Sequence, residues 1–373
     1  MKITRIDAFQ TDLPYAGATY KLSGGREYTS FDATIVRITC EDGTEGWGES
    51  TPFGATYIAA HGRGVRAGLE EVAPALLGQD PRLCDRINQR MDDALVGHNH
   101  VKTPLDVACW DLFGKSVGMP VCDLLGGRTG VRMPIISSIY AGAPEEMRAR
   151  VADHRTRGYL GHSIKIGASE AEGGPALDAE RIAACLADRQ RGEFFLVDAN
   201  GGLTPETALR MLRLLPDGLD FVLEAPCATW AETISLRRRC PVPIILDELA
   251  TDEASLIQLI RDDAADGIGL KISKNGGLTS GRRQRDICLA AGLTLSVQET
   301  VGSHIAFAAI CHLGQTVPPH MLRCILDCRD MVTTVTAAFD ATMQDGGVLA
   351  PGTPGLGLRP DLDVLGAPVA TWT

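Results

Sequence analysis

Residues 163–299 contain five short apolar runs that each end in a charged side chain: SIK (163–165), FFLVD (194–198), FVLE (221–224), PIILDE (243–248) and GIGLK (267–271). The charged residues Lys165, Asp198, Glu224, Asp247 and Lys271 follow one another at intervals of 33, 26, 23 and 24 positions. A β-strand with its returning helix takes about 25–30 residues. Each interval therefore predicts one βα unit, and the five charged groups are expected to converge at one edge of the sheet.

The alternation of strand and helix extends from about residue 134 to about residue 330. Strands are predicted at 134–140, 162–166, 194–198, 221–224, 243–247, 267–272, 293–298 and 322–328. Helical patterns such as ETALRMLRLL (206–215) and EASLIQLIRDD (253–263) fill the gaps. Eight strands with intervening helices predict an α/β fold, a closed (β/α) barrel of the TIM type. The active site of such a barrel lies at the carboxyl ends of the strands, where the five charged residues stand.

The N-terminal part follows a different pattern. Strands are predicted at 2–12 and 32–40, and EGWGES (45–50) continues after the turn EDGT. Three helical patterns follow, of which the last is PLDVACWDLFGKSVG (104–118). We predict a small α+β domain over residues 1–128, the barrel over 129–345, and a C-terminal segment, 346–373, that packs back on the first domain. Two irregular stretches, near 15–28 and 51–57, are expected to be functional loops.

Composition excludes several classes of protein. The net charge of −11 and the lack of a basic run disfavour nucleic acid and anionic membranes as partners. The N-terminus alternates like a strand and does not resemble a signal peptide, and no apolar run reaches the ~18 residues of a membrane span. Eleven cysteines, an odd number without a CxxC motif, are expected to be reduced and mostly buried. We therefore expect a cytoplasmic protein.

Asp198, Glu224 and Asp247 would place three oxygen ligands on one rim of the barrel. Such a set suits a hard divalent cation, and Mg²⁺ leaves positions for water or substrate. No His or Cys lies nearby in these runs, which disfavours zinc. One Asp after a strand is commonly a helix N-cap, but three at evenly spaced strand ends favour a metal site. Asn200 either orients a ligand carboxylate or serves the turn, and Glu248 is a substrate contact, a support for a ligand or a surface residue.

Lys165 and Lys271 would flank this cation on both sides. A partly desolvated lysine near a divalent cation has a lowered pKa and can act as a base near pH 7. A metal that binds a substrate carboxylate stabilises the enediolate formed when the α-proton leaves. Lysines on opposite faces suit racemisation, epimerisation or β-elimination. Lys274 is a rival to Lys271, but three residues further along a strand its side chain would point to the opposite face.

Five motifs carry a family resemblance: SIKIG (163–167), VDANGG (197–202), LEAPC (223–227), LDE (246–248) and KISKNGGLT (271–279). They resemble the signatures of the enolase superfamily, in its muconate-lactonizing-enzyme subgroup, and the resemblance spans nearly the whole chain. It implies Mg²⁺ on the three carboxylates, the two lysines as an acid/base pair, and an N-terminal capping domain whose two loops close over the substrate. One departure is Ser163, where the subgroup usually has a lysine that would help depress the pKa of Lys165.

Within the subgroup, FDATIVRI (31–38), STPFGATY (50–57), GHN (97–99) and SVQETVGSHIAFAA (296–309) most resemble enzymes that act on proline derivatives. The resemblance implies a lyase that dehydrates cis-3-hydroxy-L-proline to Δ1-pyrroline-2-carboxylate through α-proton abstraction and an enediolate. A related group contains hydroxyproline betaine 2-epimerases, so the alternative is a 2-epimerase or racemase of proline or hydroxyproline derivatives. A barrel retained as a binding scaffold is disfavoured by the complete set of three carboxylates and two lysines.

A cationic ring nitrogen in the substrate needs an anionic or acceptor partner. Glu299 with Gln298 is one candidate, and Asp327 on the eighth strand is another. Tyr20, Tyr57 and His98 are expected to contact the substrate from the capping domain, whereas His304 is expected to be structural. We predict a small amino-acid substrate, no nucleic-acid or membrane partner, and a homo-oligomer of a size that the sequence does not give.

Overall fold

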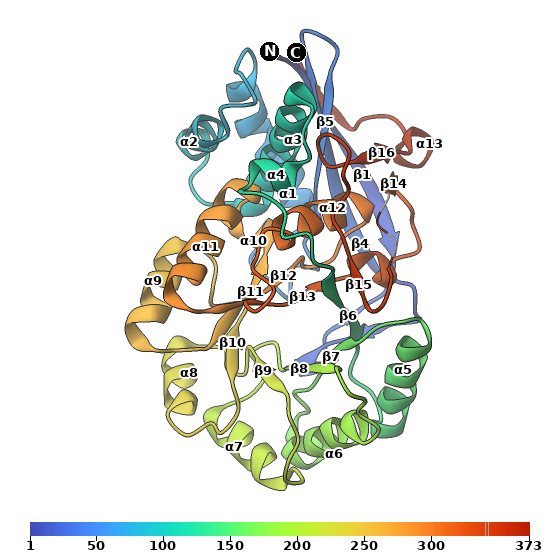
Figure 1. Cartoon of the computed structure of the whole chain (residues 1–373), viewed down its shortest axis with the longest axis vertical. Coiled ribbons are helices and arrows are strands. Elements are labelled where there is room, and N and C mark those ends of the chain that lie inside the picture. The colour runs from blue at the N-terminus through green and yellow to red at the C-terminus, as the bar shows by residue number, and fades with distance from the viewer. Residues whose placement is uncertain (340, 342) are drawn as a thin grey trace.

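The computed structural model describes residues 1–339, 341 and 343–373. Eight parallel strands stand side by side in sequence order, and pairing of the last with the first closes them into a barrel (Figure 1). They are β6 (Met133–Ile139), β7 (Gly161–Lys165), β8 (Phe194–Asp198), β9 (Val222–Glu224), β10 (Ile244–Leu246), β11 (Gly267–Lys271), β12 (Thr294–Gln298) and β13 (Leu322–Leu326). Because every strand lies within two residues of its predicted limits, the predicted barrel is confirmed.

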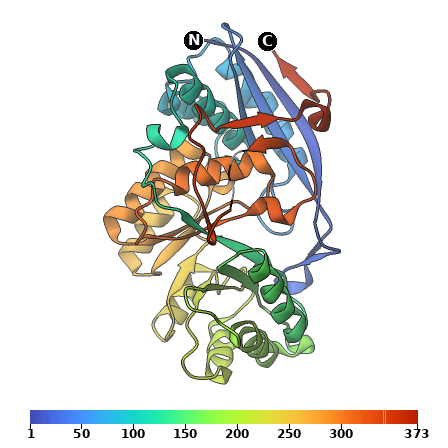
Figure 2. The same cartoon turned by 45° about the vertical axis from the view of Figure 1, so that its right-hand side comes forward.

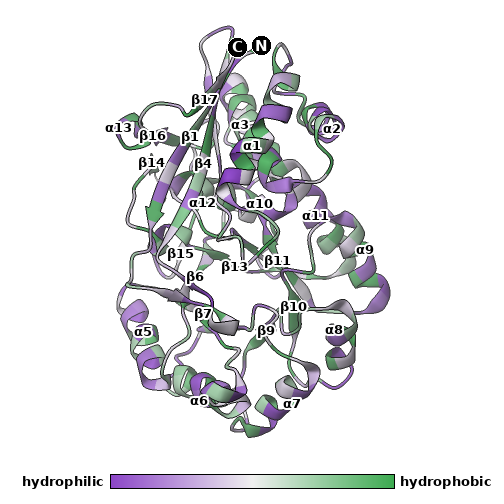
Figure 3. Ribbon diagram, turned by 180° about the vertical axis from the view of Figure 1, so that it is seen from behind, coloured by the Kyte–Doolittle hydropathy of each residue, from purple (hydrophilic) through white to green (hydrophobic). Residues whose placement is uncertain are grey.

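Helices surround the barrel and connect successive strands. They are α5 (Pro144–Thr156), α6 (Gly174–Leu186), α7 (Pro205–Leu214), α8 (Trp230–Arg237), α9 (Glu253–Asp262), α10 (Ile272–Asn275), α11 (Leu278–Ala291) and α12 (His304–Gly314). The side chains of Thr204, Thr229 and Asp252 accept a backbone N–H of the first turn and so fix the starts of α7, α8 and α9. Figure 3 shows hydrophilic and hydrophobic residues interleaved along the outer helices, as expected when one face packs on the strands.

The N-terminal part forms the expected α+β unit at one end of the molecule (Figure 2). Its sheet contains β1 (Ile3–Pro14), β4 (Ser30–Cys40) and β5 (Glu45–Ser50), all antiparallel, and β17 (Ala370–Trp372) adds a strand beside β1. Helices α1 (Gly62–Val72), α2 (Cys84–Ala94) and α3 (Asn99–Val117) cover this sheet, and α4 (Val121–Leu124) leads into the barrel. Buried aliphatic side chains of the sheet and helices share one core.

Residues beyond 330 contact both parts of the molecule. β14 (Ala337–Phe339) pairs with β16 (Leu358–Pro360), β15 (Gly347–Val348) pairs with β6 of the barrel, and α13 (Leu362–Leu365) precedes β17. The limits 1–128, 129–345 and 346–373 stay predictions, and Asp340 and Thr342 lie outside the described residues. Among the helices that the structure describes, none combines the length and apolarity needed to cross a membrane.

An aromatic cluster joins the two loops of the N-terminal part to the barrel mouth. The first loop contains the hairpin of β2 (Tyr20–Lys21) and β3 (Glu27–Tyr28), and the second joins β5 to α1. The Phe53 ring stands 5.3 Å from that of Tyr20 and 4.7 Å from that of Phe31, measured between centroids. Val301 and Met331 of the barrel belong to the same buried cluster. The loops are therefore packed over the carboxyl ends of the strands.

Candidate active site

The five charged residues singled out in the sequence occupy consecutive positions around the barrel mouth. Lys165 ends β7, Asp198 ends β8, Glu224 ends β9, Asp247 directly follows β10 and Lys271 ends β11. In a closed ring of eight strands, β7 and β11 are four strands apart and so stand opposite each other. All five are buried: the lysines are 8% and 5% exposed and each carboxylate is 1% exposed.

Each carboxylate has a partner within the protein. Asp198 accepts a hydrogen bond from Lys165. Asp247 lies 2.5 Å from Lys271 Nζ and 2.7 Å from Lys274 Nζ, and the Tyr57 hydroxyl donates to it across 3.2 Å. Glu224 accepts a bond of 3.1 Å from Gln298 Nε2. The lysines therefore stand against the carboxylates on both sides of the rim.

Burial and crowding shift the pKa values of these groups in opposite directions. Burial, and then the charges of Asp198 and Asp247, raise the pKa of Glu224 well above its usual value. Burial acts in the same direction on Asp247, but the ammonium groups of Lys271 and Lys274 outweigh it and lower the pKa of Asp247. The chain alone thus disfavours the anion of Glu224 and favours that of Asp247.

The pKa values of the two lysines are raised, contrary to the lowered values expected from the sequence. Burial lowers each pKa, but the negative charge of Asp198 for Lys165, and of Asp247 and Glu248 for Lys271, more than compensates. The expectation assumed a divalent cation beside the lysines. The protein alone supplies only the carboxylates, which favour the ammonium form.

The donor set fits a hard cation, although the described residues contain no group of three His, Cys, Asp or Glu side chains already gathered as metal ligands. Three buried carboxylates on neighbouring strands bring only oxygen atoms, the ligands that Mg²⁺ prefers. Two further buried oxygen atoms beside them, Asn200 Oδ1 and Glu248 Oε2, have no hydrogen-bond partner within the part of the chain that the structure describes. Asp198, Glu224 and Asp247 therefore remain the proposed metal ligands.

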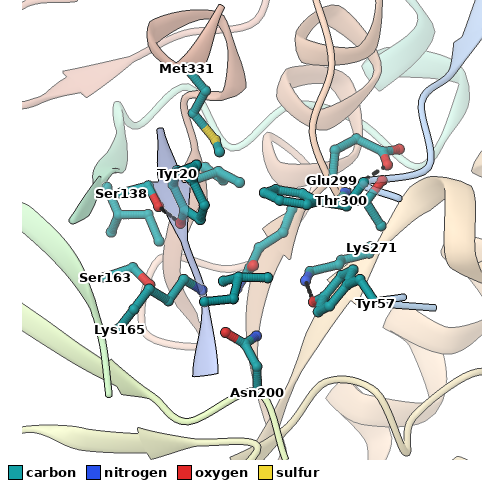
Figure 4. Close-up of a pocket in the computed structure, with 15 residues that line it drawn as sticks. Tyr20, Tyr57, Ser138, Ser163, Lys165, Asn200, Lys271, Glu299, Thr300 and Met331 are labelled. Carbon is teal, nitrogen blue, oxygen red and sulfur yellow. Dashed lines mark hydrogen bonds between the residues drawn. The ribbon is translucent and has the colours of Figure 1, made fainter. Parts of the chain in front are cut away.

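A cavity of about 20 Å³ lies between the two lysines. Figure 4 shows Lys165 and Lys271 entering it from two sides, with Asn200 between them at the barrel rim. The predicted contacts Tyr20, Tyr57, Asn200, Gln298 and Glu299 line this cavity. Two do not: Glu248 and His98 line a neighbouring cavity of about 610 Å³, which shares Tyr57 as its wall.

The lining residues are held by their own contacts. Asn200 donates its backbone N–H and its side-chain amide to Asp198, at 2.8 and 3.0 Å, and its amide also reaches Glu248 Oε1 at 3.1 Å. Glu299 accepts the backbone N–H groups of Ser273 and Thr300. Burial raises the pKa of Glu299 to about 8, although these hydrogen bonds act in the opposite direction.

Two sequence-based arguments are wrong. Lys274 does not continue a strand, because β11 ends at Lys271 and α10 begins at the next residue. The helical turn brings the Lys274 ammonium to Asp247 instead of turning it to the opposite face. Asp327 is paired with Arg329, whose Nε and Nη2 each donate at 2.8 Å, so its charge is already neutralised and it does not line the central cavity.

Sequence reasoning also missed several lining residues. Ser138, Phe53, Thr300 and Met331 line the central cavity. Ser138 lies near the carboxyl end of β6, which is the only signal in the sequence, and its hydroxyl bonds that of Tyr20. Ser163 also lines the cavity. The wall beside Lys165 is therefore uncharged where a lysine was expected.

Comparison with known proteins gives matches over both parts of the chain. Residues 26–126 match the N-terminal domain model of mandelate racemase and muconate lactonizing enzymes, and residues 146–364 match the model of enolase C-terminal domain-like proteins. A cis-3-hydroxy-L-proline dehydratase of Roseibium aggregatum is 38% identical over 373 residues, with 100% of both chains covered. An N-succinyl-L-Arg/Lys racemase of Bacillus cereus is 27% identical over 321 residues, with 84% of each covered.

A crystal structure from Roseovarius nubinhibens has the same fold throughout. It is described as a mandelate racemase/muconate lactonizing enzyme complexed with magnesium, is 62% identical, and covers 100% of both chains with a TM-score of 0.99. The barrel and the N-terminal domain of this chain thus match together and in order. The chain belongs to the enolase superfamily, in its mandelate racemase/muconate lactonizing enzyme family.

Proposed function

We propose that this enzyme dehydrates cis-3-hydroxy-L-proline to Δ1-pyrroline-2-carboxylate and requires Mg²⁺. One observation carries the proposal: two buried lysines end strands on opposite sides of the barrel and open on the same small cavity. The full-length similarity to a dehydratase of this substrate supports the choice of reaction. Eleven free thiols, ten of them buried, support a cytoplasmic location. A homo-oligomeric state is part of the proposal.

Asp198, Glu224 and Asp247 would hold the cation, with Asn200 fixing Asp198 through two hydrogen bonds. When bound, Mg²⁺ supplies positive charge that stabilises the negative charge developing on the substrate carboxylate. Its charge also offsets that of the carboxylates, which is what holds both lysines protonated in the chain alone.

The stereochemistry of the substrate suits the two lysines. In cis-3-hydroxy-L-proline the α-hydrogen and the 3-hydroxyl lie on opposite ring faces, so the elimination is anti. The neutral amine of Lys165 takes the proton from C2, and the electron pair of that bond forms the C2–C3 double bond. The C3–O bond breaks as the Lys271 ammonium donates a proton, and water leaves. The enamine then tautomerises to Δ1-pyrroline-2-carboxylate.

A 2-epimerase or racemase of proline derivatives is the alternative. The same two lysines invert C2 when the second protonates C2 instead of a leaving hydroxyl. The similarity to an N-succinyl-L-Arg/Lys racemase supports keeping this alternative, at a lower identity than the dehydratase.

Incubation in deuterated water with Mg²⁺ separates the two reactions. We expect cis-3-hydroxy-L-proline to give pyrroline carboxylate, observed by NMR. Inversion at C2 with the 3-hydroxyl retained, as the main reaction, would contradict the dehydratase. Lys165→Ala should lose both C2 exchange and elimination, whereas Lys271→Ala should lose elimination by about a hundredfold or more and keep C2 exchange. Full activity in both variants would reject the chemistry.

A further inference from the structure

The segment that follows Lys271 is held by the N-terminal domain. α10 and the start of α11 lie against α3, the long helix of that domain (Figure 1). Neither the metal site nor the proposed proton transfers gives α3 a role. Its contacts nevertheless fall on the residues just after the catalytic lysine.

Four polar side chains form a stripe on α3: Asn99, Thr103, Asp106 and Trp110. Their spacing of four, three and four residues places them on one face of the helix. Asn99 Nδ2 donates to the Lys274 carbonyl at 3.0 Å. The Thr103 hydroxyl shares its proton between the Ser273 carbonyl at 3.0 Å and the Asn99 carbonyl of its own helix at 2.9 Å.

The contacts of the stripe with α11 meet at Thr279, in the first turn of that helix, and Asp106 also accepts a hydrogen bond from Asn88 of α2 at 2.5 Å. The Thr279 backbone N–H donates to Asp106 Oδ2 at 3.0 Å, and its hydroxyl donates to the other oxygen of this carboxylate. Trp110 Nε1 donates to the same hydroxyl at 2.8 Å. Thr103, Asp106 and Trp110 are at most 2% exposed, so water does not compete for these bonds.

Two glycines have backbone conformations that favour glycine, and one of them also lets the helix come this close. Gly277 has a φ of +104°, and a Cβ there would stand 2.4 Å from Asp106 Oδ2 and 2.7 Å from Asp106 Cβ. Gly276 has a φ of +95° and lies beside Asn99. The NGG of KISKNGGLT is thus explained by backbone conformation and by the approach of α3.

We propose that the α3 stripe positions Lys271, with Asn99, Thr103 and Asp106 as positioning residues that never touch the substrate. From the barrel side, the Glu299 carboxylate accepts the Ser273 backbone N–H at 2.8 Å. The turn that follows Lys271 is therefore hydrogen-bonded to both domains. Lys271 lies two residues from Ser273, and a shift of the turn moves its ammonium away from the leaving group. The expected effect on the rate of elimination rests on the proposed function, whereas the expected effect on the backbone of the turn does not.

Two carboxylates of α3 provide a matched pair for the test. Asp106 belongs to the stripe, whereas Asp111 accepts the backbone N–H groups of Trp47 and Leu356 on another side of the helix. Both are fully buried. We compare Asp106→Asn and Thr103→Val with Asp111→Asn in the full-length Mg²⁺ enzyme, measuring elimination, C2 exchange in deuterated water and amide exchange of residues 272–279.

In Asp106→Asn and Thr103→Val we expect kcat for elimination to fall by about tenfold to a hundredfold. KM and the C2 exchange performed by Lys165 should stay within about twofold, and amide exchange in 272–279 should accelerate. Asp111→Asn should leave the ratio of elimination to C2 exchange unchanged. An unchanged ratio in both stripe variants, or an equal change in Asp111→Asn, overturns the proposal. If Asp106→Asn does not fold, the comparison of Thr103→Val with Asp111→Asn tests the proposal.

The amide-exchange result needs no substrate. If the wild-type enzyme eliminates no water from any 3-hydroxyproline, the proposed function fails, yet faster exchange in 272–279 of the stripe variants alone still supports the positioning role. Unchanged exchange in those variants refutes that role whatever the reaction is.

Discussion

The surroundings of Glu224 disfavour its anionic form. Its pKa is raised by burial and by the charges of Asp198 and Asp247, so its anion destabilises the protein when no cation is bound. We predict that Glu224→Gln raises the unfolding free energy of the metal-free enzyme by roughly 1–3 kcal/mol. The variant should also lose the stabilisation by Mg²⁺, which for the wild type reaches about 2.7 kcal/mol at 100 times Kd.

Thermal unfolding in EDTA and in Mg²⁺ measures both effects. Glu180→Gln, at an exposed position of α6, removes the same charge and should change neither midpoint appreciably. A Glu224→Gln variant that Mg²⁺ still stabilises as strongly as the wild type would remove this residue from the metal site.

His312 makes stability depend on pH. Its Nδ1 accepts the Cys122 backbone N–H at 3.1 Å and its Nε2–H donates to the Leu356 carbonyl at 3.1 Å, so the ring is neutral. Burial lowers the pKa of His312 from 6.5 to about 4. Between these values the unfolded chain binds a proton that the folded chain does not, so stability is present above pH 6.5 and declines as the pH falls towards 4.

The change to test is His312→Gln, by urea unfolding at pH 7.5 and pH 5. We expect the unfolding free energy of the wild type to exceed that of the variant at pH 7.5. This difference should be about 2 kcal/mol smaller at pH 5. An advantage that is equal at both pH values would show that the ring is not neutral in the folded state.

The residue scale also shows where sequence reasoning fails. The five charged strand ends were predicted, and the structure brings them to one rim, because a regular spacing of βα units fixes their place. Lys274 was misplaced because one residue decides whether a chain continues as a strand or turns into a helix. Asp327 was misjudged because pairing with Arg329, two residues away, depends on side-chain conformation. The hydroxyl groups that line the small cavity are uncharged, so no charge pattern in the sequence pointed to them.

At the scale of elements, β5 of the N-terminal sheet is tied to α12 of the barrel by one carboxylate. Glu49, 2% exposed, accepts the backbone N–H groups of Ser303 and Ala306 at 2.9 and 3.1 Å, and the hydroxyls of Thr51 and Ser303. The two N–H groups lie at the start of α12, where a helix leaves donors unsatisfied. The last residues of the strand EGWGES thus fix the start of a barrel helix.

Glu49→Ala leaves these buried donors unpaired, and we predict a loss of about 3 kcal/mol or more in unfolding free energy. Glu45→Ala on the same strand removes a partly exposed carboxylate that has one ion pair, with Arg37, and should cost less than about 1 kcal/mol. Denaturant unfolding of the two variants makes the comparison. Equal losses would mean that the start of α12 is satisfied in another way.

The limits of the barrel strands were predicted to within two residues, whereas the start of the long helix α3 was not. The apolar periodicity of the sequence predicts this helix over residues 104–118. In the structure α3 begins at Asn99 and Pro104 lies inside it. The five additional residues carry Asn99 and Thr103, and so the stripe that contacts α10 could not be found from the sequence pattern alone.

For the whole molecule, the order of strands and helices was enough to predict the architecture. A barrel of eight βα units and an antiparallel sheet with helices each bury one continuous core, and their patterns differ in period. The pairing partner of each strand in the C-terminal segment was harder to predict from the sequence. Its strands are two or three residues long, and pairing partners for such short runs are chosen by the tertiary structure.

The pairing of β17 with β1 places the two ends of the chain side by side. Ile6 pairs with Trp372, and Figure 1 shows the N and C marks next to each other and Figure 2 shows both at the same end of the molecule. A linker of about six residues would therefore join the ends, and new ends could be opened at the exposed turn of Asp217 and Gly218. Such a circular permutant would leave the ribosome with its barrel strands divided between both ends. If it refolds with the wild-type circular dichroism and unfolding midpoint, the N-terminal sheet need not precede β9–β13 along the chain.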